Sequence, residues 1–279
     1  QIKAVPSSWI EKQGRRLNCG PYMSGAMEAR EILRQLNARK DHLQDVTKGG
    51  ISGIVNAGRI SRLWVDDDQH GYPFLSSTDI LQADISSISH IAKSIARNNS
   101  QLIIQDRWTL ITRSGSIVRM AYARADMNGM ACTEDVLRVI PDEEKIKPGY
   151  MYAYLGTKFG LPIVISGTYG SIITHLEPYH IADLPVPRLG NLEDQVHELV
   201  QQAADLRTEA SQLIAEQVKD LEEEIAGGPV VWEHISPQSF SIETQTIRGF
   251  SSRLDAFHYI GFVGEALKKA RVPLEEISK

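Results

Sequence analysis

The most regular pattern in the chain is an apolar stripe over residues 191–225. This stretch contains neither Pro nor Gly, and apolar side chains recur every three or four residues, at Leu192, Val196, Leu199, Ala203, Leu206, Ala210, Ile214, Val218, Leu221 and Ile225. Such spacing predicts one long amphipathic helix of the coiled-coil type, about 50 Å long at about 1.5 Å per residue. Asn191 is suited to cap its start, and Gly227-Gly228-Pro229 to end it.

This stripe needs a partner, because a single helix leaves its apolar face in water. The partner is a helix from this chain, a second copy of the chain or another subunit. We expect the interface at Leu192, Val196, Leu199, Leu206, Ile214, Val218 and Leu221.

The part before this helix shows shorter, mixed patterns. Short β-branched runs between turn residues predict strands at 59–65, 108–112, 117–120, 135–140 and 161–166, and helical spacing predicts helices at 26–37, 85–96 and 149–158. Strands and helices without strict alternation favour an α+β fold. Residues 181–188, which contain two prolines, are expected to form an extended exit into the long helix.

A weak repeat indicates how the chain is divided. Arg16-Leu17-Asn18, Tyr22 and Glu28-Ala29 recur 237 positions later as Arg253-Leu254-Asp255, Tyr259 and Glu265-Ala266. One occurrence precedes the mixed domain and the other follows the helix. We therefore expect a first domain at 1–190, the long helix at 191–226, and the beginning of an incomplete second copy of the first domain at 227–279.

Composition narrows the class of protein. The 279 residues are 42% hydrophobic and 23% charged, which is typical of a globular chain. Charged residues interrupt every apolar run, so no membrane span is expected, and no export leader is visible. Cys19 and Cys132, the only cysteines, are expected to be reduced, in a cytoplasmic protein.

The charge is unevenly distributed. Residues 1–188 hold 22 Lys and Arg against 19 Asp and Glu, whereas residues 189–279 hold 8 against 16. Arginines gather in one stretch of the first domain, at Arg97, Arg107, Arg113, Arg119, Arg124 and Arg138. A polyanionic partner is one interpretation, and a solvated surface is the other.

The motifs of common enzymes are absent from the sequence. It contains no Cys-x-x-Cys, His-Glu-x-x-His or phosphate-binding Gly-x-x-x-x-Gly-Lys motif. Residues 141–145, Pro-Asp-Glu-Glu-Lys, resemble the Glu-x-Lys of metal-dependent nucleases but are better explained as a polar turn, and Asp66-Asp67-Asp68 as a solvated hairpin tip. We expect no catalytic residue, metal site or cofactor in this chain, and a binding protein rather than an enzyme.

Three segments rich in Ser, Thr and Gly suggest what is bound. They lie at residues 73–80, 112–117 and 168–172. Small hydroxyl residues beside Gly allow a backbone to approach a phosphate, and Arg113 and Arg119 add charge and the ability to read bases. Each segment alone is equally consistent with an ordinary turn.

Several of these stretches, taken in order, resemble the target recognition domain of type I restriction-modification DNA specificity subunits. The matching stretches are Asn56-Ala-Gly-Arg59-Ile-Ser-Arg62-Leu-Trp64-Val, Gly71-Tyr-Pro-Phe-Leu75, Trp108-Thr-Leu-Ile-Thr112-Arg-Ser-Gly115-Ser, Tyr169-Gly-Ser-Ile-Ile173-Thr-His-Leu and Ile181-Ala-Asp-Leu-Pro-Val-Pro187. The resemblance covers about residues 50–225, and the Arg-Leu-Asn/Asp openings at 16 and 253 fit the start of each recognition domain.

The resemblance implies a non-catalytic subunit that reads one half of a split double-stranded DNA target and docks methyltransferase subunits on its long helix. Those subunits bring S-adenosylmethionine and flip the target adenine, and a restriction subunit is a further implied partner. A full subunit of this family has two recognition domains, so a second copy of this chain, paired through the helix, is another implied partner.

Carried over by residue, the resemblance gives candidate DNA-facing positions. They are Arg113, Ser114, Gly115, Ser116 and Arg119, then Thr168, Tyr169, Gly170, Ser171 and His175, then Ser76, Ser77 and Thr78. Trp64, Phe74, Leu110 and Ile173 are expected in the core, and Arg16 and Tyr22 to be structural.

Two other functions remain open from the sequence. The chain is alternatively the recognition module of a single-chain restriction-methylation enzyme or of a phage-defence methyltransferase, or a helical adaptor that binds no nucleic acid. DNA binding that weakens steeply with salt distinguishes the adaptor from the others.

Overall fold

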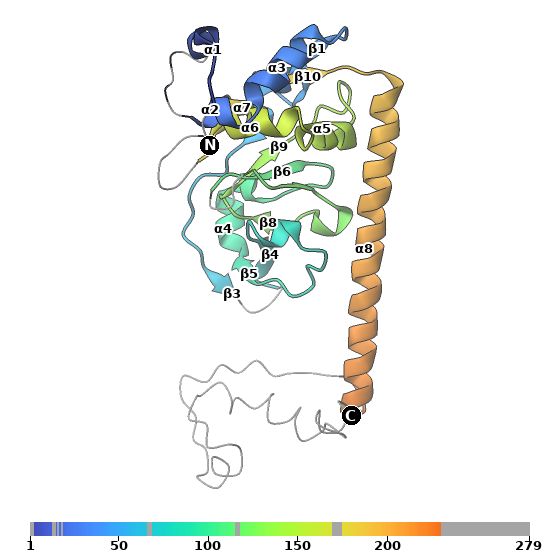
Figure 1. The fold of residues 1–279 in the computed structure, drawn as a ribbon. Helices are drawn as coiled ribbons and strands as arrows, with labels where there is room; N and C mark the ends of the chain where they lie inside the picture. Colours follow the sequence, from blue (N-terminus) through green and yellow to red (C-terminus); the bar gives the residue numbers. More distant parts are fainter. Residues whose placement is uncertain are drawn as a thin grey trace, which may run out of the picture. The chain divides into compact units, whose positions relative to one another are not determined.

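The computed structural model describes residues 3–12, 15, 17, 19–65, 69–114, 118–168 and 175–229. The chain divides into two compact units, Gln1–Ser211 and Gln212–Lys279. In the second unit the described residues are 212–229, which are chiefly the last turns of the long helix α8 (Asn191–Ala226). Figure 1 shows the order of the elements along the chain.

A four-stranded antiparallel sheet forms the centre of the first unit. Its strands β2 (Ile54–Val55), β9 (Val136–Val139), β6 (Thr109–Thr112) and β7 (Met120–Tyr122) are hydrogen-bonded in that order. Successive side chains of a strand point to opposite faces. Ile111 and Leu137 therefore enter one apolar cluster, and Leu110 and Val136 another. The sheet is covered on both faces.

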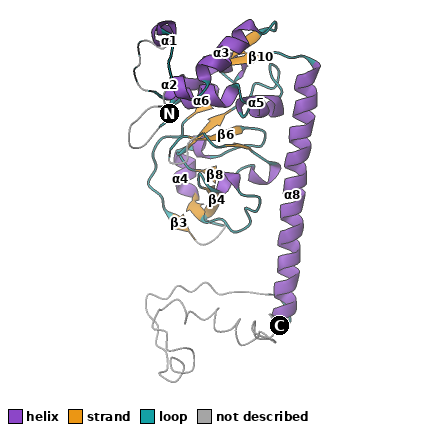
Figure 2. Cartoon of the chain, viewed as in Figure 1, coloured by secondary structure: helices purple, strands orange, loops and turns teal. Residues whose placement is uncertain are grey.

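Helices cover the first face. They are α2 (Gly20–Met23), α3 (Ala26–Gln35), α5 (Pro148–Leu155), α6 (Gly160–Gly167) and α7 (Pro178–Ile181), preceded by α1 (Ser7–Lys12). Ala26, Leu33, Met151 and Ile163 bury their side chains in the same cluster as Ile111. Figure 2 shows these helices beside the strands β6 and β9. Beside them, β1 (Lys40–His42) pairs antiparallel with β10 (Pro185–Pro187).

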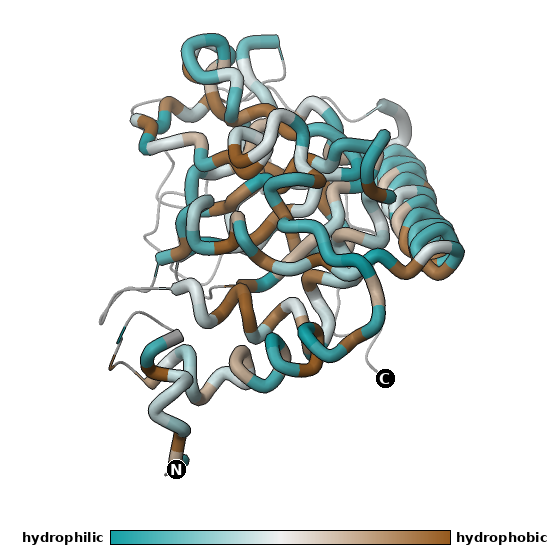
Figure 3. Tube along the Cα trace, turned by 90° about the horizontal axis from the view of Figure 1, so that it is seen from above, coloured by the Kyte–Doolittle hydropathy of each residue, from teal (hydrophilic) through white to brown (hydrophobic). Residues whose placement is uncertain are grey.

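A second sheet lies on the other face. It has the order β3 (Trp64–Val65), β5 (His90–Ala92), β4 (Gly71–Leu75) and β8 (Ala131–Cys132), and the β4–β8 pair is parallel. Leu75 and Cys132 share the second apolar cluster with Leu110, which joins the two sheets. Figure 3 shows hydrophobic segments crossing the interior of this domain. The remaining elements are α4 (Lys93–Asn98) and the short 3₁₀ turns Leu43–Val46, Gly50–Gly53, Asp79–Leu81, Ser100–Leu102 and Ala125–Met127.

The predicted α+β class is confirmed, and so are the elements with the clearest periodicity. The predicted helices at 26–37, 149–158 and 191–225 are α3, α5 and α8, and the predicted strands at 108–112 and 135–140 are β6 and β9. Phe74 and Leu110 are buried as expected, and so is Tyr22.

Four predicted elements are wrong in type or extent. Of the described residues of the predicted strand at 117–120, only Met120 lies in a strand, β7. Residues 161–166 form the helix α6, because Thr157 accepts the Gly160 N–H at its hydroxyl (3.1 Å) and the Leu161 N–H at its carbonyl (3.0 Å), which starts a helical turn. Residues 85–96 form β5 followed by α4 instead of one helix, and only residues 64–65 of the predicted 59–65 strand are extended and paired. Short apolar runs of this kind do not distinguish strand from helix.

The expected exit from the domain is part of the domain. Within residues 181–188, Pro185–Pro187 forms β10, and Val186 is fully buried against β1. Several predictions fall outside the described residues: the repeat at 253–266, all but residues 227–229 of the predicted second domain at 227–279, Arg16, Ile117, Ile173 and the Asp66-Asp67-Asp68 run.

Candidate nucleic-acid interface

Four loop segments meet in a row where β4, β6 and β8 end. The Thr133 N–H donates to the Leu75 carbonyl (2.9 Å), the Arg113 N–H to the Asp135 carbonyl (2.9 Å), and the Leu176 N–H to the Arg113 carbonyl (3.2 Å). These backbone bonds bring the described residues at 75–78, 133–135, 113–114 and 175–177 side by side. Two of the three Ser/Thr/Gly segments, those at 73–80 and 112–117, therefore meet through residues 133–135 in their described parts.

Arg113 lies in the middle of this row, and its guanidinium is held by the protein. Nε donates to the Leu176 carbonyl (3.1 Å), and a terminal nitrogen pairs with the Glu177 carboxylate. Only 13% of the Arg113 side chain and 20% of the Glu177 side chain are exposed. The Asn56 amide donates to the same carboxylate (3.1 Å), which ties the row to the end of β2. In this arrangement Arg113 holds the start of its own segment against residues 176–177.

Arg119 differs from Arg113 in its surroundings. Its backbone pairs with Thr112, whose N–H donates to the Arg119 carbonyl (2.9 Å) and whose hydroxyl accepts the Arg119 N–H (3.0 Å). Its side chain is exposed and forms no ion pair with any residue that the structure describes. An exposed guanidinium on a fixed backbone is suited to bind a phosphate or a base edge.

The serines of the row stabilise turns. The Ser114 hydroxyl donates to the Asp135 carboxylate (2.5 Å). The Ser76 hydroxyl accepts the Thr78 and Asp79 N–H groups (both 3.2 Å), and the Asp79 carboxylate accepts the Ser76 N–H (2.8 Å). Ser77 is half-buried and Thr78 is exposed. Among these residues, Thr78 is the most exposed.

The third predicted segment is described only at its ends. Thr168 follows α6 and donates its hydroxyl to the Ile165 carbonyl (2.8 Å), and His175 is half-buried. Of the candidate DNA-facing positions, Gly115, Ser116, Tyr169, Gly170 and Ser171 lie outside the described residues. The DNA contacts of all the candidate positions stay predictions.

Trp64 is not in the core, contrary to the prediction. Half of its side chain is exposed, and its ring meets Phe74 edge-on, with centroids 5.5 Å apart. Arg62 lies over the same Phe74 ring, 5.5 Å from its centroid, and donates to the Thr133 hydroxyl (3.2 Å). The exposed ring of Trp64 and the guanidinium of Arg62 thus lie at one end of the row of loops, next to Thr133. The charged residues on both sides of 63–65 were a signal of an exposed edge strand.

A buried arginine holds the row from inside the domain. Arg138 is fully buried and donates to the carbonyls of Thr133 (3.0 Å) and Cys132 (2.5 Å), with a further bond to Val136. Burial lowers the pKa of Arg138 and raises the pKa of the Cys132 thiol to about 11. Because Arg138 bonds three carbonyls around residues 133–135, it sets where Thr133 and Asp135 meet their partners.

The first part of α8 docks on the domain through small and polar side chains. Tyr122 donates its hydroxyl to Gln201 (3.0 Å), the Gly149 N–H donates to Nδ1 of His197 (3.2 Å), and Ser211 donates to the Ala83 carbonyl (2.7 Å). A Cβ on Gly149 would lie 2.9 Å from His197, so only glycine allows this approach. Glu193, Ala204 and Thr208 are the buried residues of the helix.

The apolar stripe lies on a different side of α8. At about 100° per residue, its centre is about a third of a turn from the residues that dock on the domain. Val196 packs against the first apolar cluster. The other predicted interface residues are between 47% and 66% exposed: Leu192, Leu199, Leu206, Ile214, Val218 and Leu221. No residue that the structure describes covers them.

Within the described residues, no three His, Cys, Asp or Glu side chains are grouped as a metal site would require. Residues 141–145 form the predicted polar turn, in which Lys145 pairs with Asp142 (3.0 Å). The helices of the described part include none that is both long and apolar enough to cross a membrane.

Comparisons with known proteins were made by sequence and by structure. No family model and no curated protein matches the chain. The fold is similar to the S subunit of a type I restriction-modification system from M. genitalium, with 12% identity, a TM-score of 0.42, and coverage of 69% of this chain and 45% of that chain. It is also similar to the HsdS subunit from Thermoanaerobacter tengcongensis, with 16% identity, a TM-score of 0.39, and coverage of 72% and 51%.

A third similar structure is described as the basis of complex assembly and conformational transition of the type I R-M system, with 15% identity, a TM-score of 0.41, and coverage of 74% and 52%. The chain therefore spans about half the length of each of these proteins. They come from the same systems that the sequence resembles.

Proposed function

We propose that this chain is a DNA-specificity subunit of a type I restriction-modification complex and reads one half of a two-part target. The observation that carries the proposal is the meeting of two Ser/Thr/Gly segments, at 73–80 and 112–117, and of residues 175–177 in one row beside the exposed Arg119. Backbone N–H groups, hydroxyls and a guanidinium at one edge are the groups that bind phosphates and base edges. Arg113 and Arg138 position these segments, and Arg119 and Thr78 contact the DNA.

The long helix is the second functional part in this proposal. Its docked side fixes it to the recognition domain, and its exposed stripe is free to bind other proteins. We assign this stripe to pairing with a second copy and to docking the methyltransferase subunits, which carry S-adenosylmethionine and modify adenine. A restriction subunit joins through the methyltransferase. The chain itself performs no chemistry.

The test is methylation and binding by the assembled complex. The full chain is purified together with the products of its neighbouring genes, and the complex methylates a random-sequence DNA library. We expect adenine methylation at a two-part motif. In a binding titration, Arg119→Ala should weaken affinity and lower the slope of log K against log salt by about 0.9 for each lost phosphate contact.

The matched control is Arg34→Ala, which removes an exposed arginine from α3, where it pairs with Glu31. This variant should bind DNA as the unmodified chain does. Absence of DNA binding at low salt, or equal losses for Arg119→Ala and Arg34→Ala, contradicts the proposed interface. Protein binding through α8 without any DNA binding favours the helical adaptor.

A further inference from the structure

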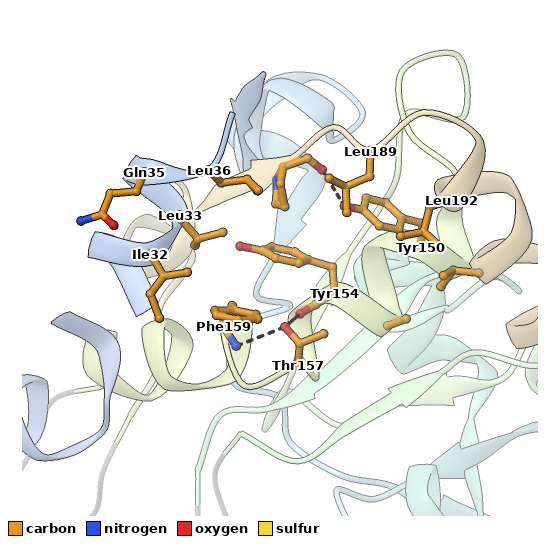
Figure 4. A pocket seen from close by; sticks show the side chains of 13 residues that line it. Ile32, Leu33, Gln35, Leu36, Tyr150, Tyr154, Thr157, Phe159, Leu189 and Leu192 are labelled. Carbon is orange, nitrogen blue, oxygen red and sulfur yellow. Dashed lines mark hydrogen bonds between the residues drawn. The ribbon is translucent and has the colours of Figure 1, made fainter. Parts of the chain in front are cut away.

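An apolar groove lies beside the start of α8. Figure 4 shows it, with a volume of about 580 Å³, between α3, α5 and the first turns of α8. Tyr150 and Tyr154 line it with their rings, while their hydroxyls donate to the carbonyls of Pro187 (2.6 Å) and Pro185. With these hydroxyls already bonded, the tyrosines present apolar faces. The groove therefore suits an apolar occupant.

The groove and the exposed stripe form one apolar surface. Leu192 and Val196 are the first two members of the stripe, and both line the groove. On the other side, Ile32 of α3 is 53% exposed and Leu36, which follows α3, is 39% exposed. A helix lying along the stripe would end beside this groove.

The two ends of the stripe are complementary to each other when two copies of α8 run antiparallel, whereas at the centre Leu206 lies opposite Ser211. Leu192 then lies opposite Ile225 of the second copy, Val196 opposite Leu221, and Leu199 opposite Val218. In a pair of chains related by a two-fold axis, the end of one helix must be complementary to the start of the other, as it is here.

The antiparallel register determines which residues of the second copy lie closest to the groove. After Ile225, α8 ends at Gly227, which has a φ of +73°, and the Gly228 N–H bonds back to the Glu223 carbonyl (3.0 Å). The next residues in the sequence, 229–232, are Pro-Val-Val-Trp. Since this register places Ile225 of one copy beside Leu192 of the other, α8 of one copy ends next to the groove of the other.

We propose that the groove between α3, α5 and α8 binds residues 229–232 of a second copy of this chain. This inference rests on the α8 pairing of the proposed function, and it adds one contact to that pairing at each end of the paired helices. By two-fold symmetry, each copy inserts its segment into the groove of the other. Trp232 is the largest side chain available to fill it.

The pairing register is tested by cross-linking the full chain in a Cys19→Ser background, which removes the exposed cysteine and leaves the buried Cys132. Leu192→Cys combined with Ile225→Cys should form a covalent dimer on mild oxidation, because antiparallel pairing brings these positions together. Leu199→Cys alone should not, since in this register it lies opposite Val218. A monomer, or cross-linking through Leu199→Cys alone, overturns the inference.

The groove is tested by the dimer dissociation constant from sedimentation equilibrium. Trp232→Ala and Leu36→Asp should each weaken dimerisation about tenfold or more, and the double variant should be little weaker than either single one. Ile51→Asp, at a residue that is 45% exposed and away from the groove, should change the constant less than twofold. Since Trp232→Ala lies outside the domain, its effect does not depend on whether Leu36→Asp perturbs α3.

The outcomes separate the groove from the DNA interface. If the dimer cross-links through positions 192 and 225 but its dissociation constant is unchanged by Trp232→Ala and Leu36→Asp, residues 229–232 do not bind the groove. The antiparallel pairing of α8 is then still supported. Loss of dimerisation in both variants, with no DNA binding by the unmodified chain, supports the groove and refutes the proposed DNA function.

Discussion

Replacing Arg113 should destabilise the recognition domain far more than replacing a surface arginine. The Arg113 guanidinium makes one hydrogen bond to a carbonyl and an ion pair with Glu177, and both side chains are at most one-fifth exposed. Arg113→Ala leaves the Glu177 carboxylate without its cation in a mostly dry site. Breaking a buried pair in this way costs about 3–5 kcal/mol, and with the residual exposure we expect about 2–4 kcal/mol.

The same change should be visible as a shift in melting temperature. For a domain of this size, about 1 kcal/mol corresponds to about 2–4 °C, so Arg113→Ala should lower Tm by about 4–16 °C. Arg34 forms a chemically similar pair with Glu31, but its side chain is 69% exposed. Exposed pairs contribute little to stability, so Arg34→Ala should shift Tm by no more than a few degrees.

The measurement is thermal and urea unfolding of both variants and of Arg113→Ala combined with Glu177→Ala. If the pair is coupled as the structure shows it, the double variant should be less destabilised than the sum of its single variants. Equal Tm values for Arg113→Ala and Arg34→Ala would refute the reasoning, because Arg113 would then be an ordinary surface residue.

Three further predictions concern the packing behind the site. Burial, together with Lys147 and Arg107, holds the pKa of His197 below its usual 6.5, so the unfolded chain takes up a proton first as pH falls. The free energy of unfolding should therefore be level above about pH 7 and decline from there toward pH 5. In urea titrations, His197→Gln should flatten this decline. Gly149→Ala should cost about 1–3 kcal/mol and speed proteolysis within α8, because its Cβ would lie 2.9 Å from His197. Arg138→Leu should lower stability by about 2–4 kcal/mol in urea unfolding, since it leaves buried carbonyls without a donor.

The sequence was sufficient for elements whose signal is local. The stripe of α8 and the apolar pattern of β6 and β9 are each contained within a short window, so the elements follow from neighbouring residues alone. Residues 161–166 show the limit of this reasoning. Their apolar run fits a strand or a helix equally well, and the hydrogen bonds of Thr157 with Gly160 and Leu161 decide the outcome.

The candidate site was predictable in its segments but not in its side-chain roles. Arg113 and Arg119 have the same chemistry and lie six positions apart in the sequence. Glu177, which pairs with Arg113, is 64 positions away, so no spacing rule connects them. The burial of Trp64 was predicted wrongly because an aromatic residue in a short strand is usually buried, but β3 is an edge strand. The charged residues that flank 63–65 were the local signal of this edge.

The two sides of α8 explain why a helix with a long apolar stripe docks on its own domain through polar groups. If the stripe packed on the domain, no apolar surface would remain for a partner. Docking instead uses single hydrogen bonds from Tyr122 and to Ala83, with the small residues Ala204 and Thr208 between them. Such bonds fix orientation but contribute only about 1 kcal/mol each. Burial of the apolar stripe, which contributes more free energy, therefore takes place on pairing. In the proposed dimer, the partner helix and the occupied groove should stabilise the attachment of α8 to each recognition domain.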